Sequence, residues 1–274
     1  MTRLLFVGDV VGRPGRELVT RGLKAIVSAH RIDCAIVNVE NSAAGFGVTP
    51  EIANEFLDAG VHVMTGGNHT FDKKEIMPFF AQESRLLRPA NLPAGAPGAG
   101  HYVARATNGV NVGVINLMGR VFMHAIDDPF RVALTEIEKV KKDATIVFVD
   151  FHAEATSEKV AMGWHLDGRA TAVVGTHTHV QTADERLLLQ GTAYITDVGM
   201  TGPHDGVIGV ERQAIVTRFL TGMPQRFETA RENPKLHGVI VEADERTGRA
   251  TSITRLSLSA KDVDALIAQA TTGR

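Results

Sequence analysis

The sequence has little cysteine, few aromatic side chains and no strong excess of either charge. Its 274 residues contain one cysteine, Cys34, and 5% aromatic residues. A single cysteine excludes an intramolecular disulfide framework. The formal net charge of -2 at pH 7 leaves no basic excess with which to wrap a nucleic acid non-specifically. A small nucleotide or a short single strand remains compatible with this charge.

Long hydrophobic runs are also missing. No apolar run approaches the ~18 residues of a membrane span, which excludes a transmembrane protein. The N-terminal residues MTRLLFVGDV contain a short apolar run but no small-residue cleavage site, so they do not form a secretory signal. Hydrophobic residues make up 44% and charged residues 22%, which is ordinary globular usage and excludes disorder, collagen and a coiled coil. We expect a soluble protein of the cytoplasm, without a membrane partner.

Short apolar runs alternate with amphipathic stretches along the chain, which is typical of an α/β protein. The expected strands cover residues 4–10, 34–39, 61–65, 111–117, 144–151, 172–175 and 193–198. The expected helices cover residues 15–30, a segment beginning at 49–51, and residues 72–82, 128–142, 157–167 and 260–269. Residues 237–258 read as a hairpin with its turn at 246–248. No repeat, low-complexity segment or linker interrupts the pattern, so we expect residues 1–274 to form a single domain.

Polar side chains with nitrogen or oxygen donors follow most of the expected strands. In open α/β sheets, ligands bind at the carboxyl ends of the strands. Carboxylate, amide and imidazole groups are metal ligands of the non-thiolate type. The residues in these positions are Asp9, Glu40, Asn41, Asn68, His69, Asn116, His152, His177, His179 and Asp197.

So many carboxylates and imidazoles cannot pack together dry and unpaired, and divalent cations would neutralise the acids. His177 and His179 would point the same way in a strand, or serve two adjacent ions if the chain turns there. Each residue also has a plainer interpretation. Asp9 or Asn68 could cap a turn, and His152 alone could be a hydrogen-bonded core histidine. The joint pattern favours a metal site, since chance would have to place these residue types after every strand.

Five motifs in fixed order resemble a known family. Gly8-Asp9, Gly67-Asn68-His69, His152 and Gly175-Thr-His177-Thr-His179 resemble the calcineurin-like metallophosphoesterases. The segments GDVVG, NVEN, GGNHTFD, DFHAEATSEK and TDVGMTGPHDGVIG are more similar still to the YmdB-like branch, whose members are small bacterial phosphodiesterases related to cyclic nucleotide hydrolysis. The resemblance extends from Asp9 to Asp197.

The sequence departs from the superfamily pattern at three positions. The histidine of the D-x-H motif is missing after Asp9, and Glu40 replaces the second-motif aspartate. In the YmdB-like branch the vacant ligand place is taken by the residue that corresponds to Asn41. Thr70 follows the GNH motif in place of an acid, which leaves Asp72 as the candidate acidic neighbour of His69.

The resemblance implies a four-layered α/β/β/α sandwich and two divalent metal ions, Fe or Mn. One ion would be held by Asp9, Glu40, Asn41 and His179. The other would be held by Glu40, Asn68, His152 and His177, with Glu40 bridging the two ions.

The resemblance also implies a mechanism. A hydroxide bridging the two ions would attack phosphorus in line with the leaving ester oxygen. His69 would donate the proton to that oxygen, because it neighbours a ligand without being one. Arg13 and His204 lie in glycine-rich loops and are candidate phosphate or substrate contacts.

The leading hypothesis is a dinuclear phosphodiesterase that hydrolyses cyclic nucleotides, such as 2′,3′-cyclic nucleotides, or similar small phosphodiesters, including RNA-derived ones. One alternative is a phosphomonoesterase, either a nucleotidase or a protein phosphatase. Another is a regulatory protein that keeps the metal site and binds a nucleotide or RNA. The loops at 42–48, 118–128 and 199–209 would decide between these substrates. Self-association as a homo-oligomer is compatible with a bacterial enzyme of this size.

Overall fold

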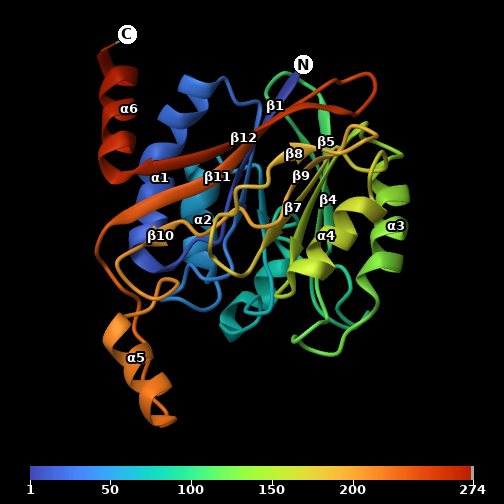
Figure 1. Ribbon diagram of the computed structural model, residues 1–274. Helices are drawn as coiled ribbons and strands as arrows, with labels where there is room; N and C mark the ends of the chain where they lie inside the picture. Colours follow the sequence, from blue (N-terminus) through green and yellow to red (C-terminus); the bar gives the residue numbers. More distant parts are fainter. Residues whose placement is uncertain (273–274) are drawn as a thin grey trace.

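Two six-stranded sheets form the centre of the molecule (Figure 1). The computed structural model describes residues 1–272. The first sheet has the order β10 (Gly202–Pro203), β11 (Pro234–Ala243), β1 (Thr2–Val7), β2 (Cys34–Asn38) and β3 (Val63–Thr65), and β12 (Ala250–Ser259) pairs with β11. Strands β1, β2 and β3 run parallel, so their carboxyl ends meet at one edge.

The second sheet repeats this arrangement with a parallel centre. Its order is β4 (His101–Arg105), β5 (Asn111–Met118), β6 (Ile146–His152), β7 (Ala172–Thr176), β9 (Ala193–Ile195) and β8 (Arg186–Leu187). Strands β5, β6, β7 and β9 are parallel, and β4 and β8 are antiparallel strands at the two edges. The loops that follow β6 and β7 therefore leave the sheet on the same side.

The two sheets pack face to face through a core of aliphatic and aromatic side chains. Phe6 of β1 and Phe148 of β6 stack across the interface with ring centroids 5.3 Å apart. The central strands are buried on both faces, which explains why the sequence shows them as continuous apolar runs. This core fixes the two sets of strand ends relative to each other.

Helices cover the outer face of each sheet. The first sheet packs against α1 (Gly12–His30), α2 (Pro50–Ala59) and α6 (Ala260–Thr272), and the second against α3 (Pro129–Val140) and α4 (Thr156–His165). Thr49 caps α2, since its side chain accepts a hydrogen bond from the N–H of Ile52 at 3.3 Å. The predicted α/β/β/α sandwich is confirmed.

Several predicted elements differ from those in the structure. The predicted helix at 72–82 is wrong: the segment forms two short 3₁₀ turns, η1 (Lys74–Ile76) and η2 (Pro78–Ala81). Pro78 has no N–H to continue an α-helical hydrogen-bond series. Three short or edge strands, β4, β8 and β10, were not predicted. The hairpin of β11 and β12 is confirmed.

Helix α5 (Arg212–Thr221) was also not predicted. None of its residues is buried, and it projects away from the sheets at the lower left of Figure 1. The amphipathic pattern that marks a core-facing helix is therefore weak in this segment. The chain that returns from α5 toward β11 passes the carboxyl ends of the strands.

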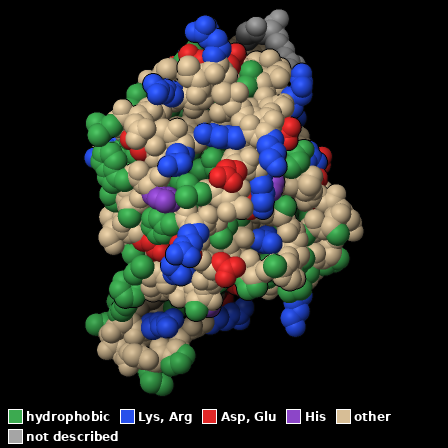
Figure 2. Space-filling model, turned by 90° about the vertical axis from the view of Figure 1, so that its right-hand side faces the viewer, with side chains coloured by type: hydrophobic (Ala, Val, Ile, Leu, Met, Phe, Trp, Pro, Cys, Tyr) green, Lys and Arg blue, Asp and Glu red, His purple; other side chains and the backbone are tan. Residues whose placement is uncertain are grey.

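The surface on the side of α3 mixes basic and acidic side chains, as Figure 2 shows. Among the helices of residues 1–272, none has both the length and the apolar character needed to cross a membrane.

Candidate metal centre

The side chains singled out in the sequence meet where the two sheets present their parallel strand ends. Asp9 follows β1, Glu40 and Asn41 follow β2, and Asn68 follows β3. From the second sheet, His152 ends β6 and the loop with His177 and His179 follows β7. Five separate segments thus contribute to one place, although they are up to 170 positions apart in the chain.

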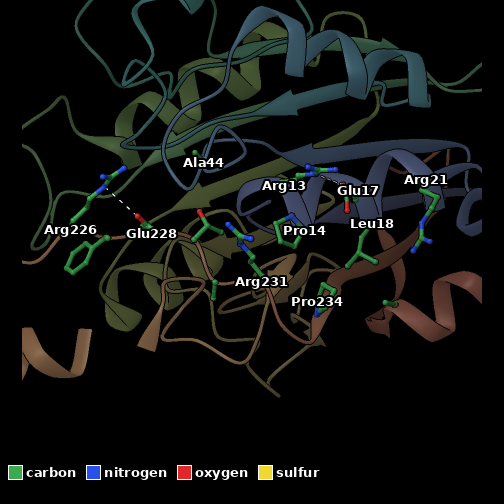
Figure 3. Close-up of a pocket in the computed structure, with 14 residues that line it drawn as sticks. Arg13, Pro14, Glu17, Leu18, Arg21, Ala44, Arg226, Glu228, Arg231 and Pro234 are labelled. Carbon is green, nitrogen blue, oxygen red and sulfur yellow. Dashed lines mark hydrogen bonds and ion pairs between the residues drawn. The ribbon is translucent and has the colours of Figure 1, made fainter. Parts of the chain in front are cut away.

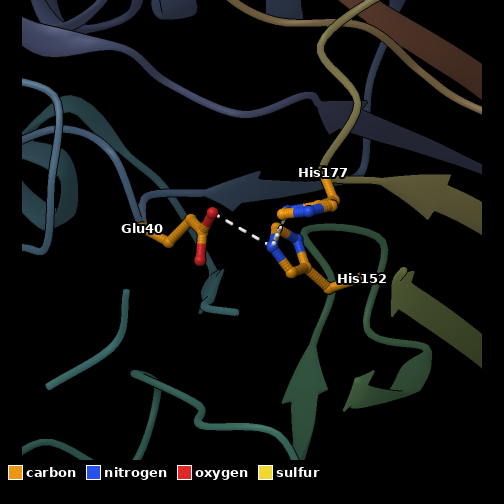
Figure 4. A group of neighbouring side chains, drawn as sticks. All are labelled: Glu40, His152 and His177. Carbon is orange, nitrogen blue, oxygen red and sulfur yellow. Dashed lines mark hydrogen bonds and ion pairs between the residues drawn. The ribbon is translucent and has the colours of Figure 1, made fainter. Parts of the chain in front are cut away.

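His152 is the centre of this group. Its ring nitrogen Nε2 lies 3.0 Å from Glu40 Oε1, 2.9 Å from Asn68 Oδ1 and 3.1 Å from His177 Nδ1 (Figure 4). One ring nitrogen carries at most one proton, so it cannot donate a hydrogen bond to all three of these acceptor atoms. Ligand atoms of Glu40, His152 and His177 all lie within 4.8 Å of one another, close enough to share one ion.

Two further oxygens at the site are buried without a partner. Asp9 Oδ1 and Asn41 Oδ1 accept no hydrogen bond from any of the described residues. The other Asp9 oxygen accepts the N–H of His177 at 3.1 Å, and the Asn41 amide donates to the carbonyl of Gly45 at 3.0 Å. Buried polar atoms are rarely left unsatisfied. These two oxygens fit the role of metal ligands.

His177 and His179 leave β7 in a strained turn and do not continue the strand. Their φ angles are +93° and +65°, in a region that residues with a Cβ rarely occupy. The strand alternation that would place both rings on one face therefore does not apply, and the turn directs the two imidazole rings differently. His179 Nδ1 lies 2.9 Å from the carbonyl oxygen of Ile208.

The charges at the site depend on one another. Burial raises the pKa of Asp9. Burial also opposes the charge on His152, but Glu40 and Asp9 outweigh it and raise the pKa of His152 to about 9. Burial and the neighbouring His152 lower the pKa of His177 to about 3. In the metal-free chain a proton on His152 thus supplies positive charge that the carboxylates require.

A second layer of hydrogen bonds orients His152. Thr176 Oγ1 donates to Asp150 at 2.8 Å and lies 2.9 Å from His152 Nδ1. Because the hydroxyl proton is used by Asp150, Nδ1 donates to Thr176. Once His152 loses its extra proton to become neutral, Nε2 is therefore the lone-pair nitrogen. Metal-binding histidines are usually held in this way. Asp150 was missed as a site residue, although a carboxylate within the apolar run IVFVDF was its signal.

A buried ion pair supports the loop after β7. Lys159 of α4 lies 2.6 Å from Asp197, and Asp197 also accepts the N–H of Thr178 at 3.2 Å. The loop after β3 is held by Asn116, which exchanges two hydrogen bonds of 3.1 Å with the backbone of Gly66. The segment DFHAEATSEK includes Lys159, but nothing in the sequence showed that this lysine is buried, since a lysine in a helix is usually exposed.

His69 stands at the rim of the group. Its Nδ1 lies 2.7 Å from Asp72 Oδ2, so Asp72 is the acidic neighbour that the sequence suggested. Its backbone N–H donates to Glu40 Oε2 at 3.1 Å, and its ring contacts the ring of Phe46. His69 lines a cavity of about 140 Å³ together with Glu40, Asn41, His177 and His179.

The two residues suggested as phosphate contacts lie in different surroundings. His204 lines neither this cavity nor the larger one beside it: its Nδ1 donates to the carbonyl of Gly202 at 2.8 Å, and its ring packs on His237. We therefore drop it as a substrate contact. Arg13 lines the larger cavity.

Comparisons with known proteins agree with this geometry. A family model described as YmdB-like protein matches residues 5–256. A 2′,3′-cyclic-nucleotide 2′-phosphodiesterase of Bacillus subtilis is 49% identical over 94% of this chain and 97% of its own length.

Two solved structures share the fold. One, described as a novel phosphatase of Mycoplasma pneumoniae, has a TM-score of 0.88 at 34% identity and covers 94% of this chain and 93% of its own. The other, a hypothetical protein of Thermus thermophilus, has a TM-score of 0.86 at 40% identity and covers 94% of this chain and 99% of its own.

Replacing Gly67 by alanine should reduce metal binding. A Cβ at this position would collide with Glu40 Oε2 and with the ring of His152, two of the candidate ligands. We expect metal affinity to fall by at least about tenfold, measured as manganese bound per chain after dialysis. Gly95→Ala is the matched control because its Cβ would enter open space. A folded Gly67→Ala protein with unchanged metal content would contradict the arrangement.

The metal-free protein should lose stability as the pH rises toward 9. The pKa of His152 is raised from 6.5 to about 9, so the folded chain keeps a proton that the unfolded chain releases. This contribution is complete below 6.5 and is lost as the pH passes through 9. Urea unfolding of EDTA-treated protein between about pH 7 and 9 measures it.

The variant Glu40→Gln tests the cause of that pH dependence. It removes the carboxylate that contributes most to raising the pKa of His152. We expect a flatter dependence of the free energy of unfolding on pH in this variant. An identical slope in both proteins would show that the Glu40–His152 pair does not carry the effect.

Proposed function

The chain belongs to the YmdB-like protein family, and on this basis we propose that it is a metal-dependent phosphoric diester hydrolase acting on 2′,3′-cyclic nucleotides or similar small phosphodiesters. One observation carries the proposal: lone-pair atoms of Glu40, Asn68 and His177 converge on His152 Nε2. The name of the Bacillus relative supports the diester and the cyclic nucleotide.

Two divalent cations fit the donors at this site. Asp9, Glu40, Asn41 and His179 would hold one, and Glu40, Asn68, His152 and His177 the other. The donors are nitrogen and oxygen without thiolate, a set that suits iron or manganese. The bound cations would supply positive charge for the phosphate oxygens and lower the pKa of the attacking water.

His69 is suited to protonate the leaving oxygen. Water releases one proton to solvent and adds to phosphorus as hydroxide, and the bond from phosphorus to O2′ breaks. O2′ takes a proton from the His69 ring to leave a 3′-phosphate, and the ring regains a proton from solvent. The Asp72 carboxylate, 2.7 Å from Nδ1, holds the ring with its other nitrogen free to act. The hydrogen bond from the backbone N–H of His69 to the carboxylate of Glu40 keeps the His69 ring next to the proposed ligands.

The proposed activity is tested with three substrates on the manganese-loaded protein. We expect turnover of 2′,3′-cyclic AMP and of bis-p-nitrophenyl phosphate, abolished by EDTA and restored by manganese or ferrous iron. Hydrolysis of p-nitrophenyl phosphate alone would instead identify a phosphomonoesterase. Nucleotide binding without turnover under any divalent ion would identify a regulatory protein.

The variant His69→Ala separates proton donation from metal binding. Loss of a general acid should lower kcat by about 10²–10⁴-fold while the metal content per chain stays unchanged. His30→Ala, at the far end of α1, is the matched control and should change neither quantity. Loss of metal from His69→Ala would show that His69 is a ligand and not the proton donor.

A further inference from the structure

A second and larger cavity adjoins the metal centre. Its volume is about 660 Å³, and Arg13, Arg21, Arg226 and Arg231 line it together with Glu17 and Glu228 (Figure 3). We call it the arginine cavity. It shares Ala44 and residues 227–229 with the small cavity at the metal centre. One molecule can therefore extend from the metal centre into the arginine cavity.

The arginine cavity has an excess of positive charge, whereas the whole chain is slightly acidic. Arg13 pairs with Glu17 at 2.6 Å, and Arg226 lies 3.7 Å from Glu228. Arg21 lies 2.9 Å from Asp264, which is not part of the cavity lining. All three pairs are exposed, and exposed pairs are weak enough for a phosphate to compete with them. Arg231 takes part in none of the ion pairs formed within residues 1–272. The cavity is thus suited to an anion.

The start of helix α1 adds to this preference. Arg13 and Pro14, in the first turn of the helix, line the cavity. No acidic residue lies in that turn, and no side chain of the described residues caps it. The Gly12 N–H already donates to the carbonyl of Asn41 at 2.9 Å, and Pro14 has no N–H. The Arg13 N–H and the helix dipole are what this end offers to a phosphate.

An aromatic side chain lies between the two cavities. Phe227 lines both of them, and the guanidinium of Arg218 lies 5.1 Å from the centre of its ring. Arginine over one face fixes the ring, and phenylalanine rings in such positions stack on nucleobases. Positive charge and an aromatic ring along one groove are the features of a single-strand binding site.

We propose that the arginine cavity binds the phosphodiester on the 5′ side of a terminal 2′,3′-cyclic nucleotide, so that the preferred substrate is the 3′ end of an oligoribonucleotide. This inference rests on the proposed function. A mononucleotide would occupy the small cavity and leave the arginines unused. The 5′-phosphate of a mononucleotide offers the same chemistry as the linking phosphodiester, and the experiment distinguishes the two.

The test compares kcat/KM for three substrates: 2′,3′-cyclic AMP, its 5′-phosphorylated form, and the dinucleotide ApA with a 2′,3′-cyclic phosphate end. We expect the dinucleotide to exceed 2′,3′-cyclic AMP by at least about tenfold. Arg231→Ala should bring this ratio close to one. Arg246→Ala, in the β11–β12 turn at the opposite end of the strands, should leave the ratio unchanged. An unchanged Tm shows that each variant is folded.

A binding measurement keeps the outcomes distinct. Fluorescence anisotropy of 5′-labelled triadenylate needs no turnover, and Arg231→Ala should weaken binding by about tenfold. Equal kcat/KM for the dinucleotide and the 5′-phosphorylated mononucleotide would overturn the proposal that an oligonucleotide is the preferred substrate. The arginine cavity would then be assigned to the 5′-phosphate of a mononucleotide. Hydrolysis of 2′,3′-cyclic AMP with a ratio near one and no triadenylate binding would overturn this inference alone. Triadenylate binding that depends on Arg231, without turnover of any substrate, would overturn the proposed function but retain the cavity.

Discussion

The structure depends on a cluster of electronegative atoms that the protein buries but does not neutralise. Asp9, Glu40 and His152 are almost fully shielded from water, and three lone-pair atoms face the single nitrogen His152 Nε2. Burying unpaired charge costs several kcal/mol per group, which is comparable to the net free energy of unfolding of a whole domain. Such a cluster is tolerable when a cation or a proton compensates it, and the raised pKa of His152 is the sign that a proton does so in the metal-free chain.

The scaffold provides rigid positions for these atoms. The face-to-face packing of the sheets brings the ends of β1, β2 and β3 next to those of β6 and β7. The candidate ligands are supported by Asp150, Thr176 and Asn116, whose hydrogen bonds fix the ring of His152 and the loop after β3. The left-handed backbone at His177 and His179 is the local cost of aiming two imidazoles from one short loop.

Much of this arrangement could be predicted from the sequence, because its causes are local or periodic. Buried strands appear as apolar runs, and Asp9, Glu40 and His152 follow or end such runs. Residues 72–82 were wrongly predicted as a helix because the apolar spacing outweighed Pro78. The turn at His177 and the buried ion pair of Lys159 could not be predicted, because they depend on contacts with Asp9 and Asp197 that are distant in sequence. The arginine cavity could not be predicted from the sequence for the same reason, since its lining combines the start of α1 with residues 226–231.

The proposed function centres on seven side chains that hold two cations where the two sheets meet. Crystals grown with manganese, measured near the manganese absorption edge, test this directly. We predict two anomalous peaks per chain. One lies within bonding distance of Asp9, Glu40, Asn41 and His179, and the other within bonding distance of Glu40, Asn68, His152 and His177, so that Glu40 lies between them. A single peak, no peak, or peaks away from these side chains would contradict the account.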